Sequence, residues 1–186
     1  MARKKITEEL TKEMIIEEAN LQFLESDFHK VSMRGIAQKL GCSHGAIYYH
    51  FNSKTELFHA VVERYFTMLN AKLEEAMEYK GAEGNMFVLM GFIEFGLNYQ
   101  TQYQFMFMKR DDKLDPLSQS AANQSLEKFH IALQHLNNQQ LEAKDIYSTF
   151  VGLHGFVIHY IGRTHSFEEA KESAKAYCEF LMKALI

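Results

Sequence analysis

The side chains best suited to bind a nucleic acid lie in one stretch of the chain, between residues 32 and 54. Hydroxyl, imidazole and cationic groups in this stretch can donate hydrogen bonds to phosphate oxygens. The candidate contacts are Ser32, Arg34, Ser43, His44, Gly45, Ala46, Tyr48, Tyr49, His50 and Lys54. We find no nucleophile paired with a base and no glycine-rich phosphate loop in the sequence, so this stretch predicts binding rather than catalysis.

The distribution of charge supports a nucleic-acid partner, although the whole chain has a net charge of −4. Residues 28–58 hold four lysines and arginines and only one glutamate. His29, His44 and His50 lie in the same stretch and can add positive charge beside phosphates. Because the chain on either side is net negative, we expect a nucleic acid to contact one face only.

Residues 33–52 fit a helix-turn-helix, in which two short helices cross steeply around a tight turn. Ala37 is small enough for the crossing, and Gly41 can adopt the left-handed conformation that the turn requires. Ser32 and Ser43 can cap the two helices. Four apolar residues have the spacing to face inward: Ile36, Leu40, Ile47 and Phe51.

The same register assigns the exposed residues of the second helix. In this motif the N-terminal end of the second helix meets the edges of bases in the major groove. Small residues at that end would let the backbone approach closely, and hydroxyl or imidazole groups further along suit phosphates. The base-facing residues are then His44, Gly45 and Ala46, followed by Tyr48, Tyr49 and His50. Lys54 begins the next helix, whose N-terminus also favours an anion.

Helical periodicity extends over the rest of the chain and predicts an all-α fold. The first predicted helix, 7–26, has an apolar stripe made of Leu10, Met14, Ile15, Ala19 and Phe23. Gly81 and Gly84 are interpreted as a wide break, and the charged residues 109–116 as a loop. The other predicted helices are 33–40, 43–51, 54–79, 85–98, a short segment through 108, 117–137, 143–163 and 167–185.

Residues 41–57, Gly-Cys-Ser-His-Gly-Ala-Ile-Tyr-Tyr-His-Phe-Asn-Ser-Lys-Thr-Glu-Leu, resemble the signature of the TetR family of bacterial transcriptional regulators. The resemblance covers about residues 10–60 and includes Ala19, Phe23, Phe28, Ser32, Arg34, Ile36 and Ala37. Two positions depart from the family pattern: Asp27 replaces the usual glycine, and Val31 replaces a common threonine.

The resemblance implies a three-helix DNA-binding domain at 1–53 and a helical domain for ligand binding and dimerisation at 54–186, about nine helices in all. It also implies a homodimeric repressor that binds a palindromic operator and responds to a small ligand. By position in the family motif, phosphates would be contacted by Ser32, Ser43, Tyr48, Tyr49, His50 and Lys54.

Methionine and aromatic residues are concentrated between residues 86 and 108, which suits a pocket for a hydrophobic ligand of variable shape. The alternative is a core whose gaps are filled by methionine. His154 lies in a Gly-Leu-His-Gly segment that resembles an element of some family members, and could be a polar contact in the pocket. The candidate ligand residues are Met86, Met90, Phe95, Tyr99, Tyr103, Phe107, Phe150 and His154.

The helices at 143–163 and 167–185 are the predicted dimer contacts. The first is apolar nearly all round, so it must be buried on two sides, one of them against a partner subunit. We predict a four-helix bundle across a two-fold axis. The alternative is one large monomeric core.

The rival hypothesis is a di-iron carboxylate enzyme, which needs two Glu-x-x-His pairs and two further glutamates. Glu56 with His59 and Glu127 with His130 have that spacing. The further glutamates do not stand out, so no metal and no cofactor is predicted. The chain has two cysteines, no predicted signal peptide and no apolar run of membrane-spanning length, so we expect a cytoplasmic protein.

Overall fold

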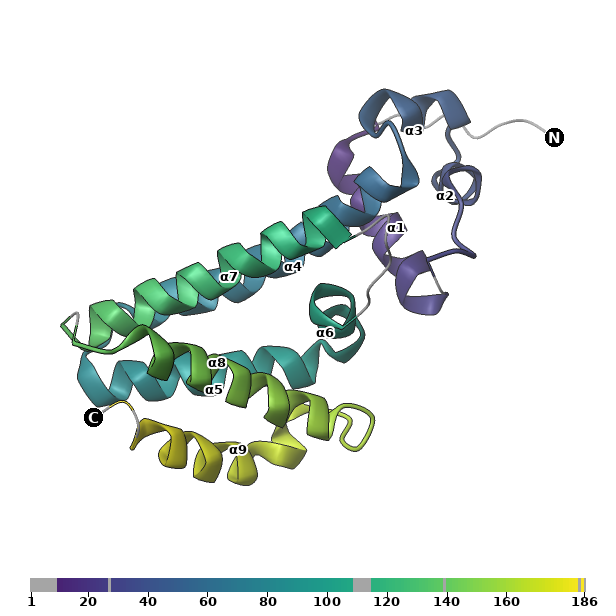
Figure 1. The fold of residues 1–186 in the computed structure, drawn as a ribbon. Coiled ribbons are helices and arrows are strands. Elements are labelled where there is room, and N and C mark those ends of the chain that lie inside the picture. The colour runs from purple at the N-terminus through teal and green to yellow at the C-terminus, as the bar shows by residue number, and fades with distance from the viewer. Residues whose placement is uncertain (1–9, 27, 109–114, 139, 184, 186) are drawn as a thin grey trace. The chain divides into compact units, whose positions relative to one another are not determined.

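The computed structural model describes residues 10–26, 28–108, 115–138, 140–183 and 185, with the backbone alone at 115–119 (Figure 1). Within these residues the fold is all-α, with nine helices and no strand. The helices are α1 (Lys12–Glu25), α2 (Met33–Leu40), α3 (His44–His50), α4 (Lys54–Ala76), α5 (Gly81–Asn98), α6 (Gln100–Phe107), α7 (Asp115–Leu136), α8 (Ala143–Tyr160) and α9 (Phe167–Met182).

The described residues fall into two compact units. Unit 1 takes in the described chain up to Arg64 and the start of α7, at 115–118. Unit 2 takes in 65–108 and the described residues from Gln119 onward. Helix α4 therefore belongs to both units, while α1, α2 and α3 belong to unit 1 alone.

Helix α1 begins later than its periodicity suggested. Thr11 has an extended backbone, and its hydroxyl accepts a hydrogen bond from the Met14 N–H at 3.2 Å, which caps the helix. The prediction of a helix from residue 7 is therefore wrong for Leu10, which precedes the cap. Ile15, Ala19 and Phe23 are buried as predicted.

The turn between α2 and α3 has the predicted geometry. Gly41 has φ 67°, in the left-handed region, where a side chain would be strained. Ile36, Ala37, Ile47 and Phe51 are buried, and Leu40 is half-buried, so the inward-facing anchors of the helix-turn-helix are confirmed.

The predicted break is confirmed beside Gly81, which has φ 54° and begins α5, and is wrong for Gly84. Helix α4 ends at Ala76, and α5 begins at Gly81, so Gly84 lies inside α5 and is buried. A Cβ at Gly84 would collide with the Leu136 side chain, so glycine serves close packing here and not a turn. The predicted start at Asn85 is four residues late.

The loop predicted at 109–116 is also corrected at its end. Asp115 and Pro116 belong to the first turn of α7. Proline is favoured there because the backbone N–H that it lacks would have no hydrogen-bond acceptor within the helix. Residues 109–114 lie outside the described part of the chain, as does Asp27.

In unit 2, α5 packs against both α8 and α9 (Figure 1). Residues of α5 are buried on nearly all sides, including Val88, Leu89, Phe92, Ile93 and Leu97. None of the helices in the described residues combines the length and apolarity needed to cross a membrane.

Candidate nucleic-acid interface and ligand pocket

The outer face of α3 presents the residues predicted to meet DNA. His44 and Gly45 are exposed, Tyr48 is 43% exposed and Tyr49 is 87% exposed, whereas Ile47 between them is fully buried. A Cβ at Gly45 would meet no atom within 4 Å, so the backbone there is open to close approach. Burial of Ile47 fixes which side of this short helix faces outward.

The other predicted DNA contacts on α2 and α3 differ in their exposure to solvent. Arg34 is exposed, and Ala46 and His50 are half-buried. The His44 ring lies edge-on to the Tyr48 ring, with their centroids 4.8 Å apart, and the Tyr49 ring meets the His50 ring in the same way at 5.1 Å. Helix α3 therefore holds a row of paired polar rings.

Two serines fix the N-termini of α2 and α3. The Ser32 hydroxyl oxygen accepts from the Gly35 N–H at 3.1 Å, and the Ser43 oxygen accepts from the Ala46 N–H at 3.2 Å. Each capping bond uses the oxygen as acceptor and leaves the hydroxyl hydrogen able to donate to a phosphate. Both serines are exposed.

Lys54 has a structural role that the sequence did not reveal. Its Nζ donates to the carbonyl oxygens of Phe28 at 2.7 Å and Val31 at 3.0 Å, and lies 4.2 Å from the centre of the Phe28 ring. Partial burial lowers the pKa of Lys54. An ammonium has three N–H donors, so these two carbonyls leave one donor for the predicted phosphate contact.

Glu56 helps to organise the start of α4. Its carboxylate accepts from the backbone N–H of Asn52 at 2.7 Å and from the Asn52 side chain at 3.0 Å. Ser53 in turn accepts from the Glu56 N–H at 3.0 Å. A serine followed three residues later by glutamate is a sequence signal for such a cap, and we missed it.

The described part of the chain holds no group of three or more His, Cys, Asp or Glu residues placed to bind a metal ion. Of the two Glu-x-x-His pairs, Glu56 is engaged in the cap of α4 and Glu127 is exposed.

Four of the predicted ligand residues come together in unit 2. The Tyr103 hydroxyl and His154 Nδ1 form a hydrogen bond. The rings of Phe107 and Phe150 each lie 4.5 Å from the His154 ring, and Phe92 lies 5.1 Å from it. Burial lowers the pKa of His154 to about 4 and raises the pKa of Tyr103 well above its usual value. Both groups are therefore uncharged near pH 7.

The other four predicted ligand residues are not part of this ring cluster. Phe95 and Tyr99 contact each other, with centroids 5.2 Å apart. Met86 and Met90 are half-buried on α5. Phe95 follows Met86 by nine positions, which places the two residues on opposite sides of a helix with 3.6 residues per turn.

Gly91 marks open space inside unit 2, which sequence reasoning did not find. Gly91 is buried on α5, yet a Cβ there would meet no atom within 4 Å. Gly96 on the same helix is the opposite case, since its Cβ would lie 2.6 Å from the Val157 side chain. A buried glycine beside open space indicates a gap in the packing, because protein interiors are otherwise close-packed.

The predicted dimer helices expose large apolar side chains. Tyr147 is 56% exposed, Val151 is 49% and Ile158 is 45%, all on α8, and Phe180 on α9 is 63% exposed. Tyr147, Val151 and Ile158 follow the spacing of a single face of the helix.

The comparisons with known proteins agree with this architecture. The family described as bacterial regulatory proteins, tetR family, matches residues 15–61. A transcriptional regulator of the TerR/AcrR family from Aquifex aeolicus is 20% identical, with a TM-score of 0.74 over 91% of this chain and 98% of that one. The TetR family regulator PfmR from Thermus thermophilus is also 20% identical, with a TM-score of 0.65 over 91% and 97%. The fatty acid degradation regulator FadR from Bacillus halodurans is 15% identical, with a TM-score of 0.69 over 96% of each chain. At these identities the similarity to the solved structures shows a shared fold.

Proposed function

We propose, given that this chain belongs to the tetR family of bacterial regulatory proteins, that it represses transcription as a ligand-responsive homodimer bound to a palindromic operator. The observation that carries this proposal is the α2–α3 pair, in which a left-handed Gly41 and a buried Ile47 turn the polar side of α3 outward. The protein would act in the bacterial cytoplasm.

Specific binding in this proposal needs two copies of the chain. His44, Gly45 and Ala46 offer few hydrogen bonds to base edges, so a single α3 discriminates only weakly between DNA sequences. Two recognition helices about 34–36 Å apart read two half-sites of a palindrome. The exposed apolar face of α8, continued by Phe180 of α9, is the proposed dimer surface.

The proposed ligand site is the open space beside Gly91 in unit 2. The apolar residues of α5 around it suit a small hydrophobic ligand. Helix α4 is continuous from Lys54 to Ala76 and belongs to both units, so it is the proposed link between ligand and DNA. A ligand would favour a conformer whose two α3 helices no longer match the operator spacing.

The test begins with selection of an operator from random duplex DNA by the wild-type protein. Affinity for the selected duplex is then measured over a range of salt concentrations for Arg34→Gln and for Arg163→Gln. Both arginines are exposed, but Arg34 lies on α2 and Arg163 follows α8 in unit 2. Loss of one phosphate contact should lower the slope of log affinity against log salt by about 1 for Arg34→Gln alone. Failure to enrich any duplex, or equal effects of both variants, would contradict the proposal.

A further inference from the structure

Among its described residues, unit 2 contains two buried polar side-chain atoms that have no hydrogen-bond partner. They are Oδ1 of Asn70 on α4 and Oγ of Ser125 on α7, and Ser125 is fully buried. Buried polar atoms are almost always paired, because the loss of water is otherwise uncompensated. Two such atoms in one unit therefore require an explanation.

Both atoms belong to the interior sides of their helices. Asn70 follows Phe66 by one turn, and the Phe66 ring meets the ring of Phe107 at 5.3 Å. Ser125 precedes Phe129 by one turn, and Phe129 meets the ring of Phe92 at 6.1 Å. Phe92 and Phe107 both flank His154, so Asn70 and Ser125 each lie one helical turn from a ring that packs against the aromatic cluster.

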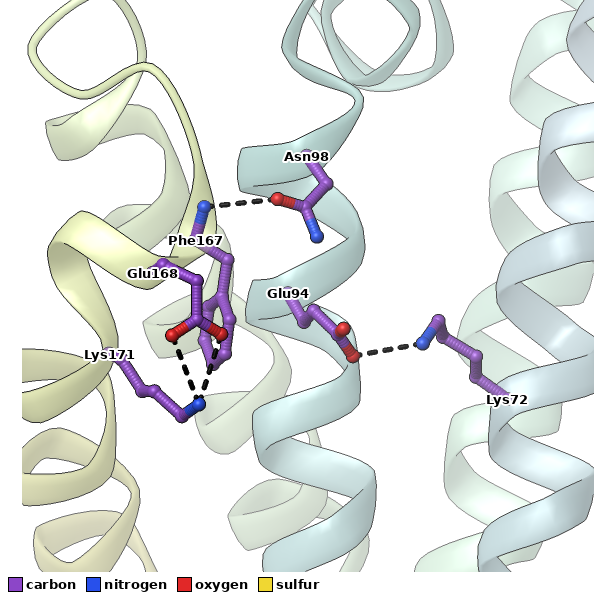
Figure 2. A network of polar contacts seen from close by, with 6 residues as sticks. All are labelled: Lys72, Glu94, Asn98, Phe167, Glu168 and Lys171. Carbon is purple, nitrogen blue, oxygen red and sulfur yellow. Dashed lines mark hydrogen bonds and ion pairs between the residues drawn. The ribbon is translucent and has the colours of Figure 1, made fainter.

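Ion pairs join the helices that carry these atoms to their neighbours. Glu74, one turn after Asn70, accepts from Lys128 of α7 at 2.8 Å. Lys72 of α4 donates to Glu94 of α5 at 2.9 Å, as Figure 2 shows. Glu94 follows Gly91 by three residues, so the open space beside Gly91 lies on the part of α5 that is tied to α4.

The side chains of these two ion pairs are partly exposed to solvent and do not lie in the interior of unit 2. The side chains of both ion pairs are 36–53% exposed. Inside, His154 and Tyr103 are uncharged near pH 7, and Asn70 and Ser125 carry no charge. An isolated charge in such surroundings would be strongly disfavoured. A hydroxyl group, in contrast, can donate to an amide oxygen and accept from a serine hydroxyl at the same time.

We propose that the interior of unit 2 binds an uncharged, largely apolar molecule whose hydroxyl group donates to Oδ1 of Asn70 and accepts from Oγ of Ser125. The apolar part of this molecule occupies the space beside Gly91. The inference deepens the proposed function, because it names the chemical class of the ligand. It can be tested without DNA, by direct binding to the full chain.

The first experiment compares three eight-carbon probes by calorimetry: octan-1-ol, its ether isomer 1-methoxyheptane, and octanoate. The ether can accept from Ser125 but cannot donate to Asn70. We expect octan-1-ol to bind about tenfold more tightly than the ether, the usual effect of one satisfied hydrogen bond. Octanoate should bind more weakly than both at pH 7, because its charge is not compensated.

Two variants then assign the two hydrogen bonds. Asn70→Leu should abolish the preference for octan-1-ol over the ether, whereas Ser125→Ala should weaken both probes about tenfold or less. Each variant also removes an unpaired buried atom, so the melting temperature of the ligand-free protein should rise. A merely structural role would not combine higher stability with weaker binding. Ser120→Ala, at an exposed position of α7, is the matched control and should change neither quantity.

The proposal is overturned if octanoate binds most tightly, if neither isomer binds up to its solubility limit, or if the variants leave the preference unchanged. It is also overturned if a crystal structure of the octan-1-ol complex shows Asn70 and Ser125 bridged only by water. Release of the selected operator is measured separately. Tight octan-1-ol binding without operator release would contradict the repressor mechanism and leave this ligand assignment standing.

Discussion

Lys54 shows how one side chain can serve both the fold and the proposed DNA contact. Its two carbonyl partners, in Phe28 and Val31, lie between α1 and α2. Lys54→Met keeps the apolar stem and removes the ammonium. We expect the free energy of unfolding to fall by about 1–3 kcal/mol, because two charge-assisted hydrogen bonds are lost.

The DNA-binding effect of the same variant has a distinct signature. If the third N–H of Lys54 meets a phosphate, Lys54→Met also lowers the salt slope of operator binding by about 1. Chemical denaturation and salt-dependent binding measure the two effects separately. Lys39→Met, at an exposed position of α2, is the control for stability. An unchanged stability of Lys54→Met would contradict the role assigned to the two carbonyl contacts.

His154 should make the stability of the protein depend on pH. Burial lowers its pKa in the folded chain from 6.5 to about 4. Between these values the unfolded chain binds a proton that the folded chain does not, so stability falls as the pH falls through this window. The whole effect amounts to about 3 kcal/mol at most.

Substitution isolates that contribution of His154. His154→Gln keeps an acceptor for the Tyr103 hydroxyl but cannot titrate, so the loss of stability from pH 6.5 to 4 should become smaller. His135→Gln, at an exposed site on α7, should leave it as it is. Urea denaturation at a series of pH values provides the measurement. The same steep decline in His154→Gln as in the wild type would rule out His154 as its source.

The sequence predicted local contacts of single residues and missed the distant ones. The caps at Ser32 and Ser43 join residues three apart, so residue type and spacing are sufficient to predict them. The Lys54 contacts join residues 23 and 26 positions apart, and no periodicity encodes them. The sequence also does not predict that the buried oxygens of Asn70 and Ser125 lack partners, because this depends on which donors and acceptors all the neighbouring helices place around them.

At the scale of the elements, the turn between α2 and α3 is the feature on which the direction of α3 depends. Gly41→Ala places a side chain at φ 67° and should destabilise the protein by about 1–2 kcal/mol. Relief of that strain would move α3, so operator affinity measured on the folded fraction should fall several-fold.

Gly162 provides the control for this turn. It has φ 72°, and a Cβ there would meet nothing within 4 Å, so Gly162→Ala carries the same backbone strain outside the helix-turn-helix. Thermal denaturation of the two variants should be similar, while only Gly41→Ala weakens operator binding. Equal operator affinities for the two variants would show that this turn does not set the position of α3.

The boundaries of helices were predictable where polarity alternates and not where it is uniform. Around α2 and α3, serine caps and Gly41 mark the ends of amphipathic segments. In α5 nearly every side is buried, so apolar periodicity carries little information about where the helix begins. Gly84 was then interpreted as a break, although its partner Leu136 lies 52 residues away.

For the whole molecule, the sequence indicated an all-α fold of about nine helices, and the described residues confirm it. The proposed dimer has to be tested at the surface between two chains. Ile158 is 45% exposed on the apolar face of α8, and Ile131 of α7 is 47% exposed, so the two isoleucines are matched in accessibility. Ile158→Glu would place an unpaired carboxylate in an interface repeated across the two-fold axis, which is strongly unfavourable.

We therefore expect Ile158→Glu to raise the dissociation constant of the dimer at least about 100-fold, the effect of roughly 2.7 kcal/mol. Ile131→Glu should remain dimeric in sedimentation equilibrium, since α7 is not part of the proposed interface. Operator affinity should fall as the dimer dissociates, because a monomer carries only one weakly discriminating α3 and cannot read both half-sites. If Ile158→Glu stays dimeric, or if Ile131→Glu dissociates equally, the subunits associate through another surface. Far-ultraviolet circular dichroism of both variants establishes that the helices remain intact, so that dissociation is not mistaken for unfolding.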